Sequence, residues 1–182
     1  MILDRLLRFS NAQTLVQAVG TVASTDVVDF GIGTSADPAI PSNANGGGVR
    51  DMGVGDDPAL KFVVQIITAA TSGGAGTLSV TIQGAPDDGT GAPGAYTSWW
   101  TSPAYALATL AAGARLLNMD MPRPPAGVAV PRFVRLLYTV GAFDLTGGTI
   151  SSYLVLDRDD QMYNSTSNGV LGGYPAGINV AN

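Results

Sequence analysis

The sequence predicts an all-β protein, an antiparallel two-sheet sandwich whose favoured form is a jelly roll, and three observations predict it. Apolar and polar residues alternate over several runs, as they do in half-buried strands. Glycine and proline supply 35 of the 182 residues, about 19% against roughly 12% in average proteins. All 14 acidic residues are Asp and eight of the nine basic residues are Arg. The Glu and Lys that favour helix surfaces are therefore nearly absent.

The composition also limits the function. The length of 182 residues is enough for one domain with a core of its own. The absence of Cys and His removes disulfides, thiol chemistry, the usual general base and the commonest metal ligand. A net charge of −5 speaks against nucleic-acid binding, and no apolar run approaches the roughly 20 residues of a membrane span. We therefore expect a non-enzymatic protein of the cytosol without cofactor or metal, which binds neither nucleic acid nor membrane.

The first segment, residues 1–13, is expected to form an N-terminal arm or a short helix. The apolar side chains in "MILDRLLRF" share a broad helical face, and the charged ones lie off it. Two interpretations are open: the segment lies on its own domain, or it docks on a neighbouring chain. In the second case its contact residues are Leu3, Leu6 and Phe9.

The central segment, residues 14–157, is expected to hold about eight strands. Strands are indicated in "TLVQAVGTV" (14–22) and "TDVVDFG", before a Pro/Asn/Gly-rich loop at 34–48. The runs 59–70 and 76–85 follow, separated by the glycine-rich "TSGGAG", which we interpret as a hairpin loop. The first of these runs is uniformly apolar, which is typical of a strand in mid-sheet. The second alternates, with a dry face made of Leu78, Val80 and Ile82.

The next stretch is a long predicted loop, residues 86–103, which contains two adjacent tryptophans. Residues 105–110 and 114–121 are then expected to be two short strands, or the first of them a short helix. The clearest pattern is "PRFVRLLYTVGAFDLTGGTISSYLVLD" at 131–157, two alternating runs joined by a glycine-rich connection. In the first run one face carries Val134, Leu136, Tyr138 and Val140.

The last segment, residues 158–182, is rich in Asn, Gly and Ser and cannot form a core by itself. It is either a disordered tail or an extended C-terminal arm that a partner orders. We favour the arm because single apolar residues recur along it. Its contact candidates are Leu171, Tyr174 and Ile178.

Few side chains in this sequence are candidates for chemistry. The paired carboxylates at 56/57, 87/88 and 159/160 lie in glycine-rich turns, so we interpret them as turn formers. The lone serines have no histidine partner for nucleophilic catalysis. Tyr96, Trp99 and Trp100 fit either a protein contact, core packing or, as in carbohydrate-binding sandwiches, the stacking of a sugar ring.

Several segments of the chain carry a family likeness, in the same order through most of residues 1–157. They are "MILDRLLRFSNAQ", "VVDFG", "RDMGVGDDPALKFVVQI", "AGTLSVTIQGAPD", "LAAGARLL" and "RFVRLLYTVGAFDLTGGTISSYLVLD". The chain in this respect resembles the capsid cement (decoration) proteins of short-tailed, double-stranded DNA bacteriophages. The insertion at 34–48 and the tail after residue 158 depart from that family's pattern.

The resemblance implies both a fold and a function. It implies a jelly-roll domain on the outer surface of a mature capsid, assembled in the cytoplasm of a bacterial host. The expected partners are the major capsid protein, whose neighbouring subunits it bridges, and other copies of itself in a symmetric dimer or trimer. The resemblance carries no catalytic residues. The alternative function is a lectin-like carbohydrate-binding module on a phage particle.

Overall fold

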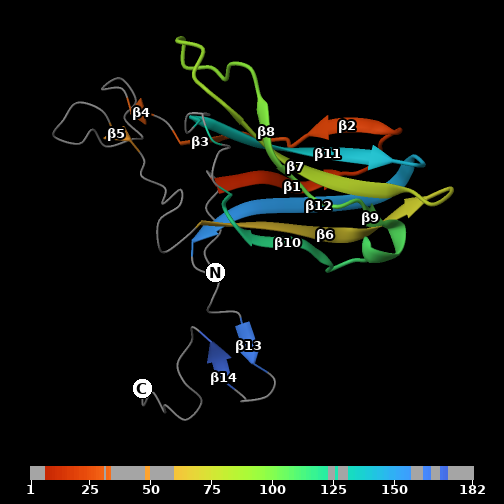
Figure 1. The fold of residues 1–182 in the computed structure, drawn as a ribbon. Helices are drawn as coiled ribbons and strands as arrows, with labels where there is room; N and C mark the ends of the chain where they lie inside the picture. Colours follow the sequence, from red (N-terminus) through yellow and green to blue (C-terminus); the bar gives the residue numbers. More distant parts are fainter. Residues whose placement is uncertain are drawn as a thin grey trace.

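The computed structural model describes residues 7–30, 32–33, 48–49, 60–122, 126, 131–156, 162–164 and 169–171 (Figure 1). Strands dominate these residues, and a 3-10 helix, η2 (Leu107–Thr109), directly follows β9. The strands of the first half are β1 (Arg8–Thr14), β2 (Gly20–Ala23), β3 (Val28–Asp29), β4 (Ile32–Gly33), β5 (Gly48–Val49), β6 (Leu60–Ser72) and β7 (Thr77–Ala85). Those of the second half are β8 (Thr97–Thr101), β9 (Tyr105–Ala106), β10 (Arg115–Asp120), β11 (Phe133–Gly141), β12 (Leu145–Leu156), β13 (Met162–Asn164) and β14 (Gly169–Leu171).

Two antiparallel sheets lie face to face. One has the strand order β1-β12-β6-β10, and the other has the order β2-β11-β7-β8, with β3 also paired to β11 and β9 to β7. Figure 1 shows them as two layers, with β11 and β7 above β12 and β6. The predicted all-β two-sheet sandwich is confirmed. Two short ladders stand apart from these sheets, β4 with β5 and β13 with β14.

The chain crosses repeatedly between the layers. Numbered along the chain, the eight longer strands run 1-8-3-6 in one sheet and 2-7-4-5 in the other. The jelly roll, a sandwich built from two Greek keys, stays a prediction with which this order agrees. The predicted hairpin at 71–76 is wrong, because β6 and β7 belong to different sheets. The turn there carries the chain across the core, so that both strands direct their apolar faces inward.

Other element boundaries also differ from the predictions. The strand predicted over 14–22 is mostly a connection, because the chain leaves one sheet after Thr14 and joins the other only at Gly20. Part of the predicted loop at 86–103 is a strand, β8, paired with β7. Strand β1 begins at Arg8, so the last six residues of the predicted N-terminal arm or short helix are sheet, paired with β12.

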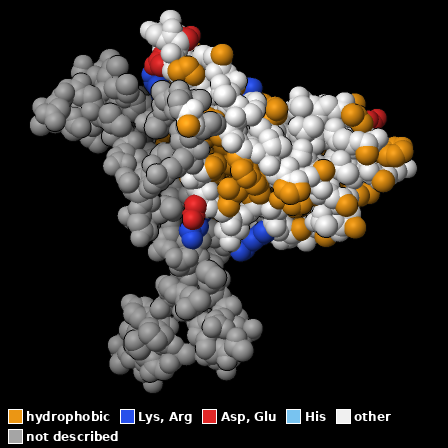
Figure 2. All heavy atoms as spheres, in the orientation of Figure 1, with side chains coloured by type: hydrophobic (Ala, Val, Ile, Leu, Met, Phe, Trp, Pro, Cys, Tyr) orange, Lys and Arg blue, Asp and Glu red, His pale blue; other side chains and the backbone are white. Residues whose placement is uncertain are grey.

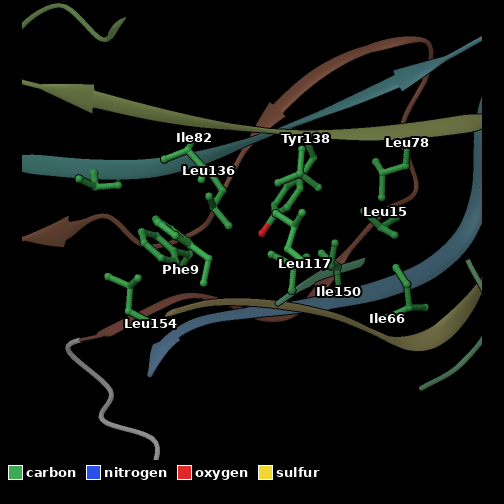
Figure 3. Close-up of a cluster of buried hydrophobic side chains, with 14 of the residues drawn as sticks. Phe9, Leu15, Ile66, Leu78, Ile82, Leu117, Leu136, Tyr138, Ile150 and Leu154 are labelled. Atoms are coloured by element: carbon green, nitrogen blue, oxygen red, sulfur yellow. The ribbon is translucent and has the colours of Figure 1, made fainter. Parts of the chain in front are cut away.

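The core fills the space between the sheets. The predicted inward faces are confirmed: Leu78, Val80 and Ile82 of β7 are buried, as are Val134, Leu136, Tyr138 and Val140 of β11. Opposite them β6, which lies in mid-sheet as predicted, buries Phe62, Val64 and Ile66. Figure 3 shows Leu78, Ile82, Leu136 and Tyr138 pointing from one layer toward the other, which contributes Ile66. Burial of this apolar surface is the main force that holds the layers together.

Irregular pairing bends the sheet that contains β1, β12 and β6. The register shifts twice between β1 and β12 and three times between β12 and β6. Ala12 occupies one shift with φ 48°, and its N–H donates to Ser151 Oγ at 2.8 Å. Gly148 occupies another with φ 114°. Such bulges increase local twist and bending, and Figure 1 shows β12 curving up toward β11 at the end of the sandwich.

Candidate interaction surfaces

The described pair of carboxylates, Asp87 and Asp88, organises the loop between β7 and β8. Asp87 Oδ1 accepts the N–H groups of Gly89 and Gly91, at 2.7 and 3.0 Å. Asp88 Oδ1 accepts the N–H and hydroxyl groups of Thr90, at 2.8 and 2.7 Å. These hydrogen bonds to the charged form hold the pKa of both carboxyls below the ordinary value. The prediction of turn formers is confirmed for this pair, and the pairs at 56/57 and 159/160 lie outside the described residues.

Arg132 ties this loop to the sandwich. Its Nε and Nη2 donate to the two oxygens of Asp29, each at 2.9 Å, and its Nη1 donates to Asp87 Oδ2. The hydrogen bonds to Asp29 raise the pKa of the guanidinium, with Asp87 adding to the effect. The guanidinium also lies 4.8 Å from the ring centroid of Phe133. Bidentate pairing fixes the guanidinium against Asp29. The bond from Arg132 to Asp87 then holds the loop where β3 and β11 meet.

A buried polar network joins the two layers. The hydroxyl of Tyr138, on β11, lies 2.8 Å from Ser10 Oγ and 2.7 Å from Ser152 Oγ, which belong to the opposite sheet. Ser10 Oγ donates to Gln13 Oε1 at 2.7 Å, so it accepts from Tyr138, and Ser152 donates to Tyr138. Figure 3 shows the tyrosine reaching across the core. Burial raises the pKa of Tyr138 to about 12.

Tyr138→Phe is expected to lower the free energy of unfolding by about 1–3 kcal/mol near pH 8, because it leaves two buried serine hydroxyls without their partner. The difference should shrink at high pH. Between pH 10 and about 12 the unfolded wild type releases the tyrosine proton while the folded protein keeps it, so wild-type stability falls by up to about 3 kcal/mol. The phenylalanine variant lacks this loss. Urea titrations of both proteins from pH 8 to 11 measure the gap, and a gap independent of pH would contradict the buried network.

The adjacent tryptophans interrupt the alternation of β8. The register of β7 with β8 shifts so that Ile82 lies opposite Trp100 while Gln83 lies opposite Ser98, which leaves Trp99 as an extra residue. Successive side chains in a regular strand point to opposite faces, and a bulge breaks that rule. Both tryptophans are half-buried and pack against the core.

Trp99 covers the backbone of β7 at a glycine. A Cβ on Gly84 would lie 2.2 Å from the Trp99 ring and 2.7 Å from Pro131 Cγ, so a side chain at this position would displace the indole. The indole Nε1 is buried and has no acceptor among the described residues. The two tryptophans therefore seal one edge of the core.

Tyr96 lies on the other face of the same sheet. Its ring lies 3.6 Å from the guanidinium carbon of Arg135, whose Nε donates to Gln83 Oε1 at 2.9 Å. Arg135 alternates with the inward residues of β11, so this contact is on the outer face. The sheet thus separates Tyr96 from the two tryptophans. The three aromatic residues do not form one stacking platform for a sugar, and the arrangement favours packing over the lectin-like alternative.

The remaining contact candidates are placed as follows. Phe9 is fully buried and stacks on Phe62, with ring centroids 5.5 Å apart, so its side chain contacts its own core. Leu171 belongs to β14, and its side chain is not described. The other candidates, Leu3, Leu6, Tyr174 and Ile178, lie outside the described residues, as do most of 158–182.

One end of the sandwich, which we call the apolar end, exposes hydrophobic side chains that the sequence analysis did not single out. It consists of three connections with the strand ends beside them, residues 15–19, 71–77 and 141–149. Val16, Val19 and Phe143 are 57%, 56% and 52% exposed there. Figure 2 shows hydrophobic side chains gathered at this end, on the right. These connections carry one charged residue, Asp144.

The opposite end, which we call the charged end, gathers ion pairs where β1, β6 and β11 begin. There Arg8 Nε lies 3.1 Å from Asp26, and Lys61 Nζ lies 3.7 Å from Asp120. Arg132 with its two aspartates lies at the same end. The two ends of the described sandwich therefore differ in chemistry: one is apolar and the other carries ion pairs.

Among the described residues, no three acidic, His or Cys side chains gather in a way that would hold a metal ion. In the same part of the chain, no helix is long and apolar enough to cross a membrane.

A family model named Bbp16 matches residues 9–154, which are 146 of the 182 residues. The chain belongs to the Bbp16 family. The Bbp16 match begins in β1 and ends in β12, so it covers the sandwich with both of its ends, and also the insertion at 34–48. The segment 158–182 lies beyond the Bbp16 match. No curated protein matches the sequence.

Proposed function

We propose that this chain is a non-enzymatic capsid cement protein, which binds the outer surface of a phage capsid, bridges neighbouring major capsid protein subunits and stabilises the shell. It acts in the virion after assembly in the cytoplasm of a bacterial host. It needs no cofactor, and copies of it associate as a symmetric dimer or trimer. The proposal includes the jelly-roll form of the sandwich.

The observation that carries the proposal is the separation of charge from apolar surface along one rigid body. Ion pairs lie at one end, and Val16, Val19 and Phe143 are exposed at the other. A body with two chemically different ends can hold two different surfaces at once, as a bridge between subunits must.

The polar groups of the described sandwich support the proposal because they serve its rigidity. Asp87 and Asp88 accept the hydrogen bonds of their own loop. Tyr138, Ser10 and Ser152 bond one another across the core. Because these carboxylates and hydroxyls bond to other groups of the sandwich, they stabilise its fold. Binding to a partner then depends on the outer surfaces of the sandwich.

The bulk properties fit the same role. An acidic chain with net charge −5 suits the exterior of a shell better than its DNA-facing side. A chain without cysteine keeps its fold in a reducing cytosol. A shell presents many copies of one surface, so modest contacts become strong when an oligomer engages several of them.

The test is to remove the protein from purified particles and then add it back. We expect stripped particles to release DNA at a lower temperature and after a milder osmotic shock, and added protein to restore both thresholds. Bovine serum albumin at equal concentration is the control for non-specific protection. Stripped and restored particles with identical rupture thresholds would refute the proposed function.

A further inference from the structure

We infer that the apolar end is the surface that docks onto the shell, with Phe143 as its anchor in an apolar socket. The inference rests on the proposed function and deepens it, because it assigns the contact to one end of the sandwich. The inferred partner of this surface is the shell lattice, and not a second copy of this chain.

The backbone that presents Phe143 is strained. The N–H of Phe143 donates to the carbonyl of Gly141 at 2.8 Å, which closes a γ-turn around Ala142, whose φ is 62°. γ-Turns with positive φ are rare, and a non-glycine residue held in this region costs on the order of 1–3 kcal/mol. Backbone strain of this kind clusters at functional sites. Here it places an aromatic ring at the apex of the turn between β11 and β12.

The ring rests on a surface that only glycine allows. A Cβ on Gly74 would lie 2.7 Å from ring carbons of Phe143, so the ring packs against the bare backbone of the β6–β7 turn. Two further bonds fix the surroundings: Val19 N–H donates to Asp144 Oδ1 at 2.8 Å, and Ser72 Oγ donates to the Asp144 carbonyl at 2.8 Å. The ring is thus held in place before binding, which lowers the entropy lost on association.

The chemistry of the end indicates the chemistry of its partner. A hollow of about 340 Å³ lies beside the ring, lined by Val19, Gly73, Ala142, Phe143, Asp144 and Thr146. Asp144, the single charge in these connections, already accepts the Val19 N–H. Depletion of charge with an aromatic residue at the centre marks the core of an interface. The surface that receives the Phe143 ring is therefore apolar.

The size of the end argues against a second copy as its occupant. Phe143 and the two valines, each about half exposed, present on the order of 300 Å² together. Two such ends in symmetric contact would bury about 600 Å², below the roughly 1,200 Å² of a stable complex. A contact this small holds only when it is repeated, and a shell lattice provides that repetition.

The experiment measures binding to stripped mature shells of the phage that encodes this chain, by co-sedimentation over a range of protein concentrations. Phe143→Ser and Val19→Ser should each weaken binding about tenfold or more. The matched controls are Ile67→Ser and Val27→Ser, which alter valine- or isoleucine-sized side chains that are 46% and 42% exposed elsewhere. These controls should bind like the wild type. Thermal unfolding of each isolated variant shows whether it is folded.

The outcomes separate the two ideas. Wild-type protein that does not bind shells refutes the proposed function itself. Wild type that binds while folded Phe143→Ser and Val19→Ser bind equally well refutes only the docking surface. Equal losses in the Ile67 and Val27 controls refute it too. If Phe143→Ser instead converts an oligomer into monomers in sedimentation velocity, the apolar end is a self-contact and the inference is wrong.

Discussion

Gly148→Ala is expected to lower the free energy of unfolding by about 3–5 kcal/mol, the largest effect of any single methyl group considered for this chain. Gly148 has φ 114°, which L side chains rarely adopt. A Cβ there would also lie 2.8 Å from Ala70 Cα and 3.1 Å from Ala70 Cβ. Ala70 belongs to β6, in the interior of its sheet, so its backbone has little room to move. Strain and steric overlap therefore add.

Two other glycines separate these two causes. Gly89 has φ 93° but open space where a Cβ would lie, so Gly89→Ala should cost only about 1 kcal/mol, from strain alone. Gly73 has open space and no such φ, so Gly73→Ala should change stability by no more than about 0.5 kcal/mol. Urea denaturation of the three variants gives the ranking. A Gly148→Ala protein as stable as Gly89→Ala would mean that the bulge between β12 and β6 is not built as described.

Phe9→Ala is expected to destabilise the isolated protein by about 3–5 kcal/mol. The side chain is fully buried against Phe62, and truncation leaves a cavity that β1 and β6 cannot close. The result distinguishes a core residue from a residue of a docking arm, which the sequence left open. An arm residue would affect binding to a partner and leave the stability of the free protein unchanged.

Phe143→Ala is the matched control, since it removes the same side chain from a site that is 52% exposed. It should cost less than about 1 kcal/mol. Thermal and urea unfolding of the two variants, at concentrations where the protein has one oligomeric state, provide the comparison. Equal stability losses for both would contradict the burial of Phe9.

The strands that the sequence predicted best are those in which one face meets the core over a long run. Leu78, Val80 and Ile82 alternate with polar residues because β7 has one dry face. The same period in β11 predicted its four inward side chains correctly. The sequence could not predict which strand belongs to which sheet, because a glycine-rich turn such as 73–76 is compatible with a hairpin or with a crossing between sheets.

The strands that the sequence missed are irregular ones. At the start of β1, Phe9 within the strand and Leu7 just before it fit a helical face as well as a strand, and only pairing with β12 decides between the two structures. In β8 the bulge at Trp99 destroys the period of two that would have marked a strand. The local periodicity of the sequence does not predict a strand where pairing with a neighbouring strand determines the backbone geometry.

The features that define the candidate surfaces are contacts between distant parts of the chain. Ser10 meets Tyr138 across 128 positions of sequence. Arg132 joins Asp29 across 103 positions and Asp87 across 45. The apolar end likewise combines three separate connections, each too short to stand out alone. No single segment could have revealed these sites.

A cryo-EM reconstruction of the mature particle tests the central claim most directly. The claim predicts sandwich-shaped density on the outside of the shell, between neighbouring major capsid protein subunits, with the turn that carries Phe143 in contact with the shell. Density inside the shell or at the tail, or a capsid exterior that lacks this protein altogether, would contradict it.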